Sequence, residues 1–457
     1  MSLVRHELPS ISFRRVISSL SSISPHNALV SFARNSVLLA LEGAITEGCL
    51  EISDGSNVYR FGTRTEGCNQ AHVQVVDENF WMHVLLSSTV AETYMMGQVK
   101  IKNLGNIMNV WLENEAGMTG TMPFVARLTA TLSGLSNAFF GQTLHNSKLN
   151  VIASYDQSNE LFKAFLSDEM MYSCALWDRP EGGPSGDLLP RPSDRRHDLE
   201  AAQLRKIHHV LRRARVKPGD RLLEFGSGWG ALAIEAARSF GCDVDTLTLS
   251  VEQKKLAEER VREAGLEGQV RVHLMDYREL PLEFEKAFDA FVSVEMIEHV
   301  GSKYYHTYFQ IVDWALKARG ATAVVTSSTF PEARYTGYQA QDFMRKYMWP
   351  NSCLPSATLL VNAAHDAAQG RFTLDSIENH SAHYARTLRE WNRRLDANLT
   401  QDMIVKDIPT LKEDSAAFDT FMRKWRYFFA YAGAGFLKGY ITCHMLSFVR
   451  EVSTELV

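Results

Sequence analysis

The stretch Leu222-Leu-Glu-Phe-Gly-Ser-Gly-Trp-Gly230 is an apolar run that passes through an acidic residue into three alternate glycines. Gly226, Gly228 and Gly230 can take backbone angles that other residues rarely adopt. They also have no Cβ to hold a ligand away from the main chain. The stretch therefore predicts a strand followed by a tight turn that binds a nucleotide-bearing cofactor.

Around this turn the sequence alternates between patterns typical of strands and of helices. Strands are predicted at residues 221–224, 244–248, 270–274, 290–294 and 321–326. Helices are predicted at about 231–239, 251–264 and 303–317. This alternation indicates an α/β fold with a mostly parallel sheet, covered on both faces, that binds ligands at the carboxyl ends of its strands.

The length of 457 residues exceeds what one core usually supports, so we expect two domains. Residues 1–150 read as an N-terminal arm followed by a small α+β domain, with a hairpin turn at Asp54-Gly55 and a helix end at Gly97. Residues 151–457 read as the catalytic domain. Prolines, glycines and charges near 179–195 predict a linker within it.

Composition narrows the class of protein. A formal net charge of −5 argues against nucleic acid as a partner. No run approaches the roughly 18 apolar residues of a membrane span. The six cysteines lack the paired spacing of a disulfide framework or a zinc site, so we expect reduced thiols, no metal and a cytoplasmic protein.

The residues that follow the next two predicted strands favour S-adenosylmethionine over a dinucleotide. Glu224 is placed to face an ammonium group. The acidic residue that a dinucleotide fold wants about 20 positions further on is missing. Thr248 and Gln253 can instead hydrogen-bond a ribose, and Asp276 can accept from an adenine amino group, with Tyr277 beside it.

Over roughly residues 150–450 the chain resembles the cyclopropane fatty acid synthase family of S-adenosylmethionine-dependent methyltransferases. The resemblance rests on Tyr172-Ser-Cys-Ala-Leu-Trp177, Glu224-Phe-Gly-Ser-Gly-Trp-Gly230, Thr248-Leu-Ser-Val-Glu-Gln253, Asp276-Tyr-Arg278, Glu295-Met-Ile-Glu-His-Val-Gly301 and Tyr347-Met-Trp-Pro-Asn-Ser-Cys-Leu-Pro-Ser356. It implies a Rossmann-like class I methyltransferase with a seven-stranded sheet. It also implies cofactor contacts from Tyr172, Ser173, Gly226, Gly228, Gly230, Thr248, Leu249, Gln253, Asp276 and Tyr277.

The resemblance also implies a bicarbonate ion beside the transferring methyl, which the family holds with a cysteine, a glutamate, a histidine and a tyrosine. Cys174, Glu298 and Tyr384 match three of these ligands. The histidine position falls at Thr326, whose hydroxyl can bond an anion but cannot carry positive charge. A cysteine common in the family appears as Ala432.

The family reaction is the attack of an alkene on the sulfonium methyl, followed by proton loss that closes a cyclopropane. The altered ion site suggests a methyl-branched or methylene product as a second outcome. An apolar pocket is needed. Aromatic residues that could line it, although a stripe at helical spacing is more often part of the core, are Tyr304, Tyr305, Tyr308, Phe309, Tyr335, Tyr338, Phe343, Tyr347 and Trp349.

The acceptor is expected to be an unsaturated acyl lipid or another apolar small molecule. Two alternatives stay open at this point, a C-methyltransferase of a polyketide or terpenoid and a non-catalytic lipid-binding homologue. A phospholipid substrate implies transient contact with a membrane surface. A homodimer is also left open by the sequence.

Overall fold

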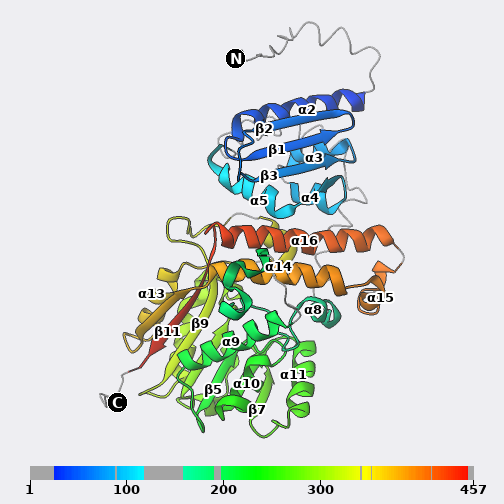
Figure 1. Cartoon of the computed structure of the whole chain (residues 1–457). Coiled ribbons are helices and arrows are strands. Elements are labelled where there is room, and N and C mark those ends of the chain that lie inside the picture. The colour runs from blue at the N-terminus through cyan, green and yellow to red at the C-terminus, as the bar shows by residue number, and fades with distance from the viewer. Residues whose placement is uncertain are drawn as a thin grey trace. The chain divides into compact units, whose positions relative to one another are not determined.

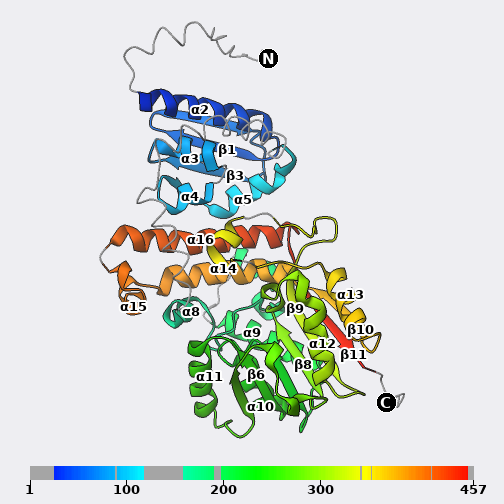
Figure 2. The same cartoon turned by 180° about the vertical axis from the view of Figure 1, so that it is seen from behind.

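The computed structural model describes residues 25–87, 90–117, 158–189, 197–339, 342–350, 352–412 and 414–450. The chain divides into two compact units, residues 1–143 and 144–457, which are described separately below (Figures 1 and 2). The predicted assignment of catalysis to the second of them stays a prediction.

The first unit contains a four-stranded sheet in the order β2-β1-β3-β4. Its strands are β1 Cys49–Asp54, β2 Asn57–Gly62, β3 Gln70–Val75 and β4 Val99–Ile101. Its helices are α2 Pro25–Ala44, α3 Asn79–Ser87, α4 Val90–Met95 and α5 Leu104–Glu113. Gly55 and Gly97 both have positive φ, at the predicted hairpin turn and just after α4.

The second unit is built on a seven-stranded sheet in the order β10-β11-β9-β8-β5-β6-β7 (Figure 1). The strands are β5 Arg221–Phe225, β6 Asp243–Thr248, β7 Val270–Leu274, β8 Ala290–Val294, β9 Thr322–Thr329, β10 Thr373–Asn379 and β11 Thr442–Val449. Only β11 runs against its neighbours. The α/β prediction and its five strands are confirmed.

Helices cover both faces of this sheet (Figures 1 and 2). Leu222 of β5 packs in one core with α9 Asp198–Arg213, α10 Ala231–Phe240 and α11 Val251–Glu263. The next residue, Leu223, packs in the opposite core with α12 Tyr305–Ala315 and α13 Ala357–Ala367. Successive strand residues point to opposite faces, so apolar runs without alternation are what a doubly covered sheet needs.

Three of the candidate lining residues belong to this second core, which is the alternative that their helical spacing favours. Tyr305, Tyr308 and Phe309 are at most 1% exposed, and they pack beside Phe225 and Phe291 under the sheet. Their helical spacing reflects the face of α12 that is buried against the strands. These three side chains therefore stabilise the fold and do not line a pocket.

The remaining α-helices are α8 Asn159–Phe165, α14 Ser381–Asn398, α15 Gln401–Ile404 and α16 Ser415–Leu437. Helices α14 and α16 lie side by side in both views (Figures 1 and 2). Shorter helical turns are Arg179–Glu181, Gly183–Leu188, Tyr277–Glu279, Leu282–Phe284, Ile297–His299, Ser302–Tyr304, Met344–Met348 and Pro409–Leu411. Within the described residues, no helix is both long enough and apolar enough to cross a membrane.

The described part of the predicted linker, up to Leu189, is held against α14. The buried Arg386 donates to the carbonyl oxygens of Glu181, at 2.7 Å, and Gly183, at 2.5 Å. Arg389 pairs with both carboxylate oxygens of Asp187, at 2.5 and 2.8 Å. Residues 190–196 lie outside the described residues.

One buried carboxylate on β6 is surrounded by basic side chains from the neighbouring strands β5 and β7. Asp245 on β6 is 1% exposed and accepts hydrogen bonds from Arg221, Arg271 and His273, each at 2.9 Å. Burial alone raises the pKa of such a group. The bonds from His273 and Arg271 outweigh burial and hold the pKa of Asp245 well below its usual range.

We predict that Asp245→Asn lowers the free energy of unfolding at pH 7 by about 2 kcal/mol, because charged partners lose their acceptor. The folded pKa is depressed, so the contribution is present above the unfolded pKa of about 3.9 and is lost as pH falls through the folded pKa. Urea unfolding followed by tryptophan fluorescence measures the difference.

Asp243→Asn is the matched control on the same strand, since the Asp243 side chain is half exposed and lies 4.0 Å from Arg271. It should cost less than about 0.5 kcal/mol. Equal losses in the two variants, or a difference between Asp245→Asn and the unaltered chain that does not shrink below about pH 4, contradict the assignment.

Candidate active site

The predicted cofactor residues gather at the carboxyl ends of three neighbouring parallel strands. The glycine turn follows β5, Leu249 follows β6, and Asp276 lies just beyond β7. The turn is fixed to β6 because the amides of Gly226 and Ser227 both donate to the carbonyl of Leu247, at 3.0 and 2.8 Å. This edge is where a doubly wound sheet binds ligands.

Backbone conformation favours glycine at all three positions of the turn, but the space that a side chain would meet differs among them. All have positive φ, at 92° for Gly226, 50° for Gly228 and 84° for Gly230. A Cβ would lie 3.3 Å from Met296 at Gly226 and 3.3 Å from Ala257 at Gly230. Nothing lies within 4 Å of a Cβ built at Gly228, so the space over that residue is open.

The turn also carries an unused polar atom. Among the described residues no hydrogen-bond partner is found for Ser227 Oγ, although the atom is buried. A buried hydroxyl without a partner is uncommon in a native protein and calls for a ligand or a water. Together with the open main chain at Gly228, this fits a polar cofactor at the turn.

Glu224 is the acidic residue that leads into the turn. It is 2% exposed and accepts a hydrogen bond from Thr246 Oγ1 at 2.6 Å. Burial raises its pKa to about 7, against the opposing influence of Thr246 and of the Lys206 ammonium. Glu224 therefore presents a carboxyl at the end of β5 that a cationic ligand would ionise.

The residues after β6 and β7 form a rim of mixed character. Thr248 Oγ1 donates to Gln253 Oε1 at 2.8 Å, while Leu249 is 73% exposed and offers an apolar surface. Asp276 pairs with Arg278 through both carboxylate oxygens, at 2.8 and 2.6 Å. The Tyr277 ring packs into the core, 5.5 Å from Phe225, so only its main chain faces the rim.

Helix α9 holds the segment from Met171 to Cys174 in place. Gln203, fully buried, donates to the carbonyl oxygens of Met171, at 3.2 Å, and Ser173, at 2.8 Å. The buried Lys206 donates to Ser173 Oγ at 2.5 Å. Burial lowers the pKa of Lys206 to about 8, and the nearby Glu295 opposes this shift.

Three of the four predicted catalytic residues meet at a fifth residue, Glu295. Its Oε1 accepts from the amide of Cys174 at 2.8 Å, and its Oε2 accepts from the hydroxyl of Tyr384 at 2.5 Å. Its own amide donates to the carbonyl oxygen of Thr326 at 3.0 Å and to Thr326 Oγ1 at 3.2 Å. Cys174, Thr326 and Tyr384 are therefore brought together around Glu295, the first and last at its carboxylate and Thr326 at its amide.

Glu298, the fourth predicted residue, lies beside this group. It is 6% exposed, and its Oε1 accepts from the amide of Ser328 at 2.6 Å. Its Oε2 is buried and has no hydrogen-bond partner among the described residues. Burial, followed by the charge of Glu295, raises the pKa of Glu298 to about 8, so this carboxyl is protonated at neutral pH.

Sequence reasoning passed over Glu295, Lys206 and Gln203. Glu295 stands in the quoted motif at 295–301, but only the second glutamate was assigned a role. Lys206 and Gln203 carry a clearer signal, because they occupy buried positions in the apolar stripe of α9, between Leu199 and Val210. Polar side chains on a buried helix face point to a site that satisfies them.

Aromatic rings form a wall next to this group. Tyr384 stacks on Phe436 with the ring centroids 4.4 Å apart, and Tyr172 lies 5.2 Å from Trp391 and 5.1 Å from Phe162. The cluster continues through Phe165, Trp229, Trp349, Trp425, Phe428 and Phe429. Of the predicted lining, Trp349 is the member that joins this cluster.

Residues 142–446 match the family described as mycolic acid cyclopropane synthetase. The chain belongs to this family. The prediction of the family is thereby confirmed.

Two curated relatives of this cyclopropane synthetase family member are each 32% identical to it. Tuberculostearic acid methyltransferase of Mycobacterium tuberculosis matches over 79% of this chain and 78% of its own length. Cyclopropane-fatty-acyl-phospholipid synthase of Escherichia coli matches over 73% of this chain and 79% of its own length. The predicted enzyme class, an S-adenosylmethionine-dependent methyltransferase, is confirmed, while the residue roles stay predictions.

Solved structures of methyltransferases share the fold. Coclaurine N-methyltransferase superimposes with a TM-score of 0.55 at 18% identity, covering 79% of this chain and 99% of that one. The cyclopropane synthase MmaA2 of Mycobacterium tuberculosis gives a TM-score of 0.52 at 22% identity, covering 68% and 100%. The seven-stranded class I methyltransferase fold is confirmed.

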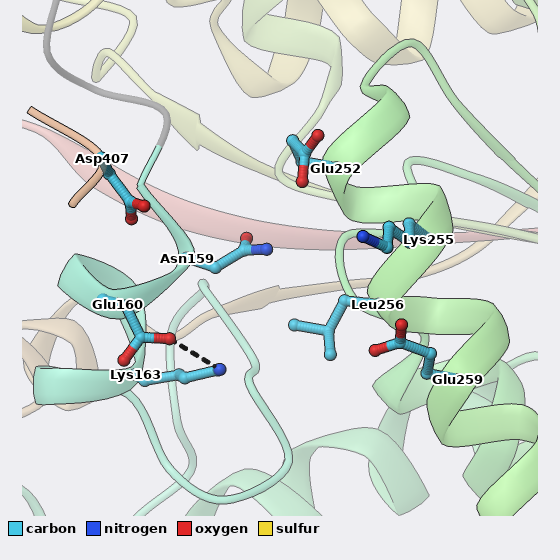
Figure 3. A pocket seen from close by; sticks show the side chains of 8 residues that line it. All are labelled: Asn159, Glu160, Lys163, Glu252, Lys255, Leu256, Glu259 and Asp407. Atoms are coloured by element: carbon cyan, nitrogen blue, oxygen red, sulfur yellow. Dashed lines mark hydrogen bonds and ion pairs between the residues drawn. The ribbon is translucent and has the colours of Figure 1, made fainter.

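A cavity of about 400 Å³ lies between α8 and α11 (Figure 3). It is lined by Asn159, Glu160, Lys163, Glu252, Lys255, Leu256, Glu259 and Asp407. None of the predicted site residues lines it, and charges of both signs make it unsuitable for an acyl chain. Asn159 on its wall accepts a hydrogen bond from the indole of Trp229, in the glycine turn, at 2.8 Å.

One group in the described part of the chain has the residue types of a metal site. Ligand atoms of His209, Glu378 and His380 lie within 4.8 Å of one another. Arg213 already pairs with Glu378 at 2.5 Å, and His209 does so at 2.7 Å. The carboxylate is thus neutralised by an arginine, and the group reads as an ion-pair network between α9 and β10.

We predict that Gly228→Ala raises the Kd for S-adenosylmethionine at least about tenfold, because a methyl group would fill the open space over the turn. Isothermal titration calorimetry measures the change. Gly265→Ala is the matched control, since Gly265 also has positive φ, at 69°, and open space around its Cβ, but lies on the exposed loop after α11.

Both variants should lose about 1 kcal/mol of stability from the left-handed backbone conformation. Only Gly228→Ala should change the affinity. Equal Kd values in the two variants would place the cofactor elsewhere.

Proposed function

We propose that this protein is an S-adenosylmethionine-dependent C-methyltransferase that acts on the alkene of an unsaturated acyl lipid. The observation that carries the proposal is the buried group around Glu295, set between the glycine turn and a wall of aromatic rings. Family membership, with relatives named as fatty acid methyltransferase and cyclopropane synthase, supplies the substrate class.

S-adenosylmethionine, when bound, supplies an electrophilic methyl group. We assign its binding to the glycine turn, to Glu224 and to the predicted residues on neighbouring elements: Tyr172, Ser173, Thr248, Leu249, Gln253, Asp276 and Tyr277. The open main chain at Gly228 and the unsatisfied Ser227 hydroxyl support this assignment. Glu224 provides a carboxyl to face the ammonium group of the methionine portion.

The chain's own residues protect the reaction. Attack by an alkene leaves positive charge on the acceptor, and water would trap that cation. The rings of Tyr172, Trp391 and Phe436 exclude water, and their faces can stabilise positive charge. The same apolar wall suits an acyl chain better than a polar acceptor.

The predicted bicarbonate does not fit the residues present. Two of its expected donors, the Cys174 main chain and the Tyr384 hydroxyl, are already bound to the two oxygens of Glu295. At Thr326, the hydroxyl oxygen accepts from the Glu295 amide at 3.2 Å. We therefore derive no step through bicarbonate.

An acyl lipid substrate requires at least transient contact with a membrane surface, and we include that contact, for a cytoplasmic enzyme, in the proposal. A homodimer stays a prediction. The polyketide or terpenoid alternative has less support, because the two relatives named above carry the names of a fatty acid and a fatty-acyl phospholipid.

We predict that the purified chain transfers label from trideuteromethyl S-adenosylmethionine to vesicles of a monounsaturated phospholipid. Mass spectrometry of the released acyl chains gives the product. A cyclopropane or a methylene keeps two of the three deuterium atoms, and catalytic hydrogenation distinguishes them. No transfer to any lipid, with cofactor binding intact, would favour the non-catalytic lipid-binding alternative.

Two variants separate binding from turnover. Asp276→Ala should weaken cofactor affinity by about tenfold, because a charged acceptor is lost at the rim. Glu298→Gln should leave the affinity nearly unchanged and lower turnover, since Glu298 lies in the helical turn after β8, beside Glu295, and not on the rim after β6 and β7. Calorimetry and the labelled assay test both, and wild-type behaviour of the two variants would overturn the site assignment.

A further inference from the structure

Glu295 occupies the centre of the predicted anion site with its own carboxylate. Both oxygens accept strong hydrogen bonds, one from the Cys174 amide at 2.8 Å and one from the Tyr384 hydroxyl at 2.5 Å. These donors come from chain segments 121 residues before and 89 residues after the glutamate. Two donors this distant in sequence meet at one carboxylate because the tertiary fold brings their segments together there.

The backbone at Glu295 is held in an unusual conformation to achieve this. Its φ is +51°, in the left-handed region that favours glycine. The carbonyl and hydroxyl oxygens of Thr326 on β9 both accept from its amide and so fix the conformation. Strain of this kind, maintained by the surrounding structure, is concentrated at functional sites.

The charge around the site distinguishes the two glutamates. Burial raises the pKa of Glu295, but the Cys174 amide, the Tyr384 hydroxyl and the Lys206 ammonium favour its ionised form. Glu298 has no such cation among the causes of its shift, and its pKa rises to about 8. The hydrogen-bond donors and the cation thus favour the ionised form of Glu295, whereas the surroundings of Glu298 favour its protonated form.

We propose that the Glu295 carboxylate is the proton acceptor of the methyl-transfer reaction and takes the place of a free bicarbonate ion. This inference rests on the proposed function. The carbon–sulfur bond of the cofactor breaks as the methyl carbon bonds to one alkene carbon, and the other alkene carbon becomes cationic. A Glu295 oxygen removes a proton from the transferred methyl, and the released electron pair closes the cyclopropane.

The same acceptor also serves the second product. If a hydride first shifts to the cationic carbon, the positive charge moves to the carbon that bears the new methyl. Removal of a methyl proton by Glu295 then yields a methylene group, and atoms and electrons balance without a further reagent. From the described part of the chain each carboxylate oxygen accepts a single hydrogen bond, so a lone pair remains for the proton.

The test compares the unaltered protein with Glu295→Gln and Glu295→Gly in buffer stripped of carbon dioxide. The unaltered protein should keep its full rate, and added sodium bicarbonate should not raise it. Both variants should lose at least about a hundredfold in turnover, the usual contribution of a general base. Bicarbonate should restore turnover to Glu295→Gly, which vacates the anion site, but not to Glu295→Gln, which fills it.

Glycine suits the left-handed backbone at this position, so Glu295→Gly should fold, and S-adenosylhomocysteine affinity checks that the cofactor site is intact. Bicarbonate dependence of the unaltered protein, near-normal turnover of Glu295→Gln, or failure of bicarbonate to rescue Glu295→Gly would each overturn the inference. Absence of methyl transfer by the unaltered protein, even with bicarbonate, would instead overturn the proposed function.

Discussion

A carboxylate withdrawn from water must be satisfied by the protein, and the active end of the sheet depends on satisfying one at Glu295. Moving an ionised carboxyl out of water costs several kcal/mol unless donors replace the solvent. The Cys174 segment and helix α14 donate to the carboxylate through the Cys174 amide and the Tyr384 hydroxyl, while Thr326 of strand β9 accepts from the Glu295 amide and fixes the main chain. The requirement of one side chain therefore links elements that are remote in sequence and defines where the site can form.

The balance of charge at this edge suits positively charged chemistry. Glu224 is buried, Glu295 is partly buried, and both lie near one buried cation, Lys206, which is itself held by Ser173. A sulfonium cofactor brings one positive charge, and the acceptor carries a positive charge after attack. Two carboxylates opposite one ammonium leave a net negative environment for both states, so the electrostatics favour methyl transfer over reactions that develop negative charge.

The features that depend on local sequence could be predicted, and those that depend on remote contacts could not. Strands β5 to β9 and the glycine turn follow from apolar runs and backbone freedom. Glu295 was missed because no feature of the neighbouring sequence shows that its side chain contacts Cys174 and Tyr384. Helical spacing left Tyr308 open between pocket and core, and the structure packs it in the core beside Phe225 and Phe291. The aromatic rings beside Glu295 are Tyr384 of α14 and Phe436 of α16. These two helices meet through tertiary packing, which local sequence does not reveal.

Glu295 and Glu298 lie on one turn after β8. Because they are close together, their carboxyl groups differ in protonation and therefore in role. Two carboxyls in a shared low-dielectric site do not both ionise, because each raises the pKa of the other. Burial raises the pKa of Glu295 as well, but the hydrogen bonds from Cys174 and Tyr384 and the charge of Lys206 oppose that shift and favour its ionised form. Glu298, left protonated, can donate a hydrogen bond within the site but cannot take a proton. A base that is part of the chain stays in position beside the aromatic wall, whereas a free anion would have to bind before each turnover.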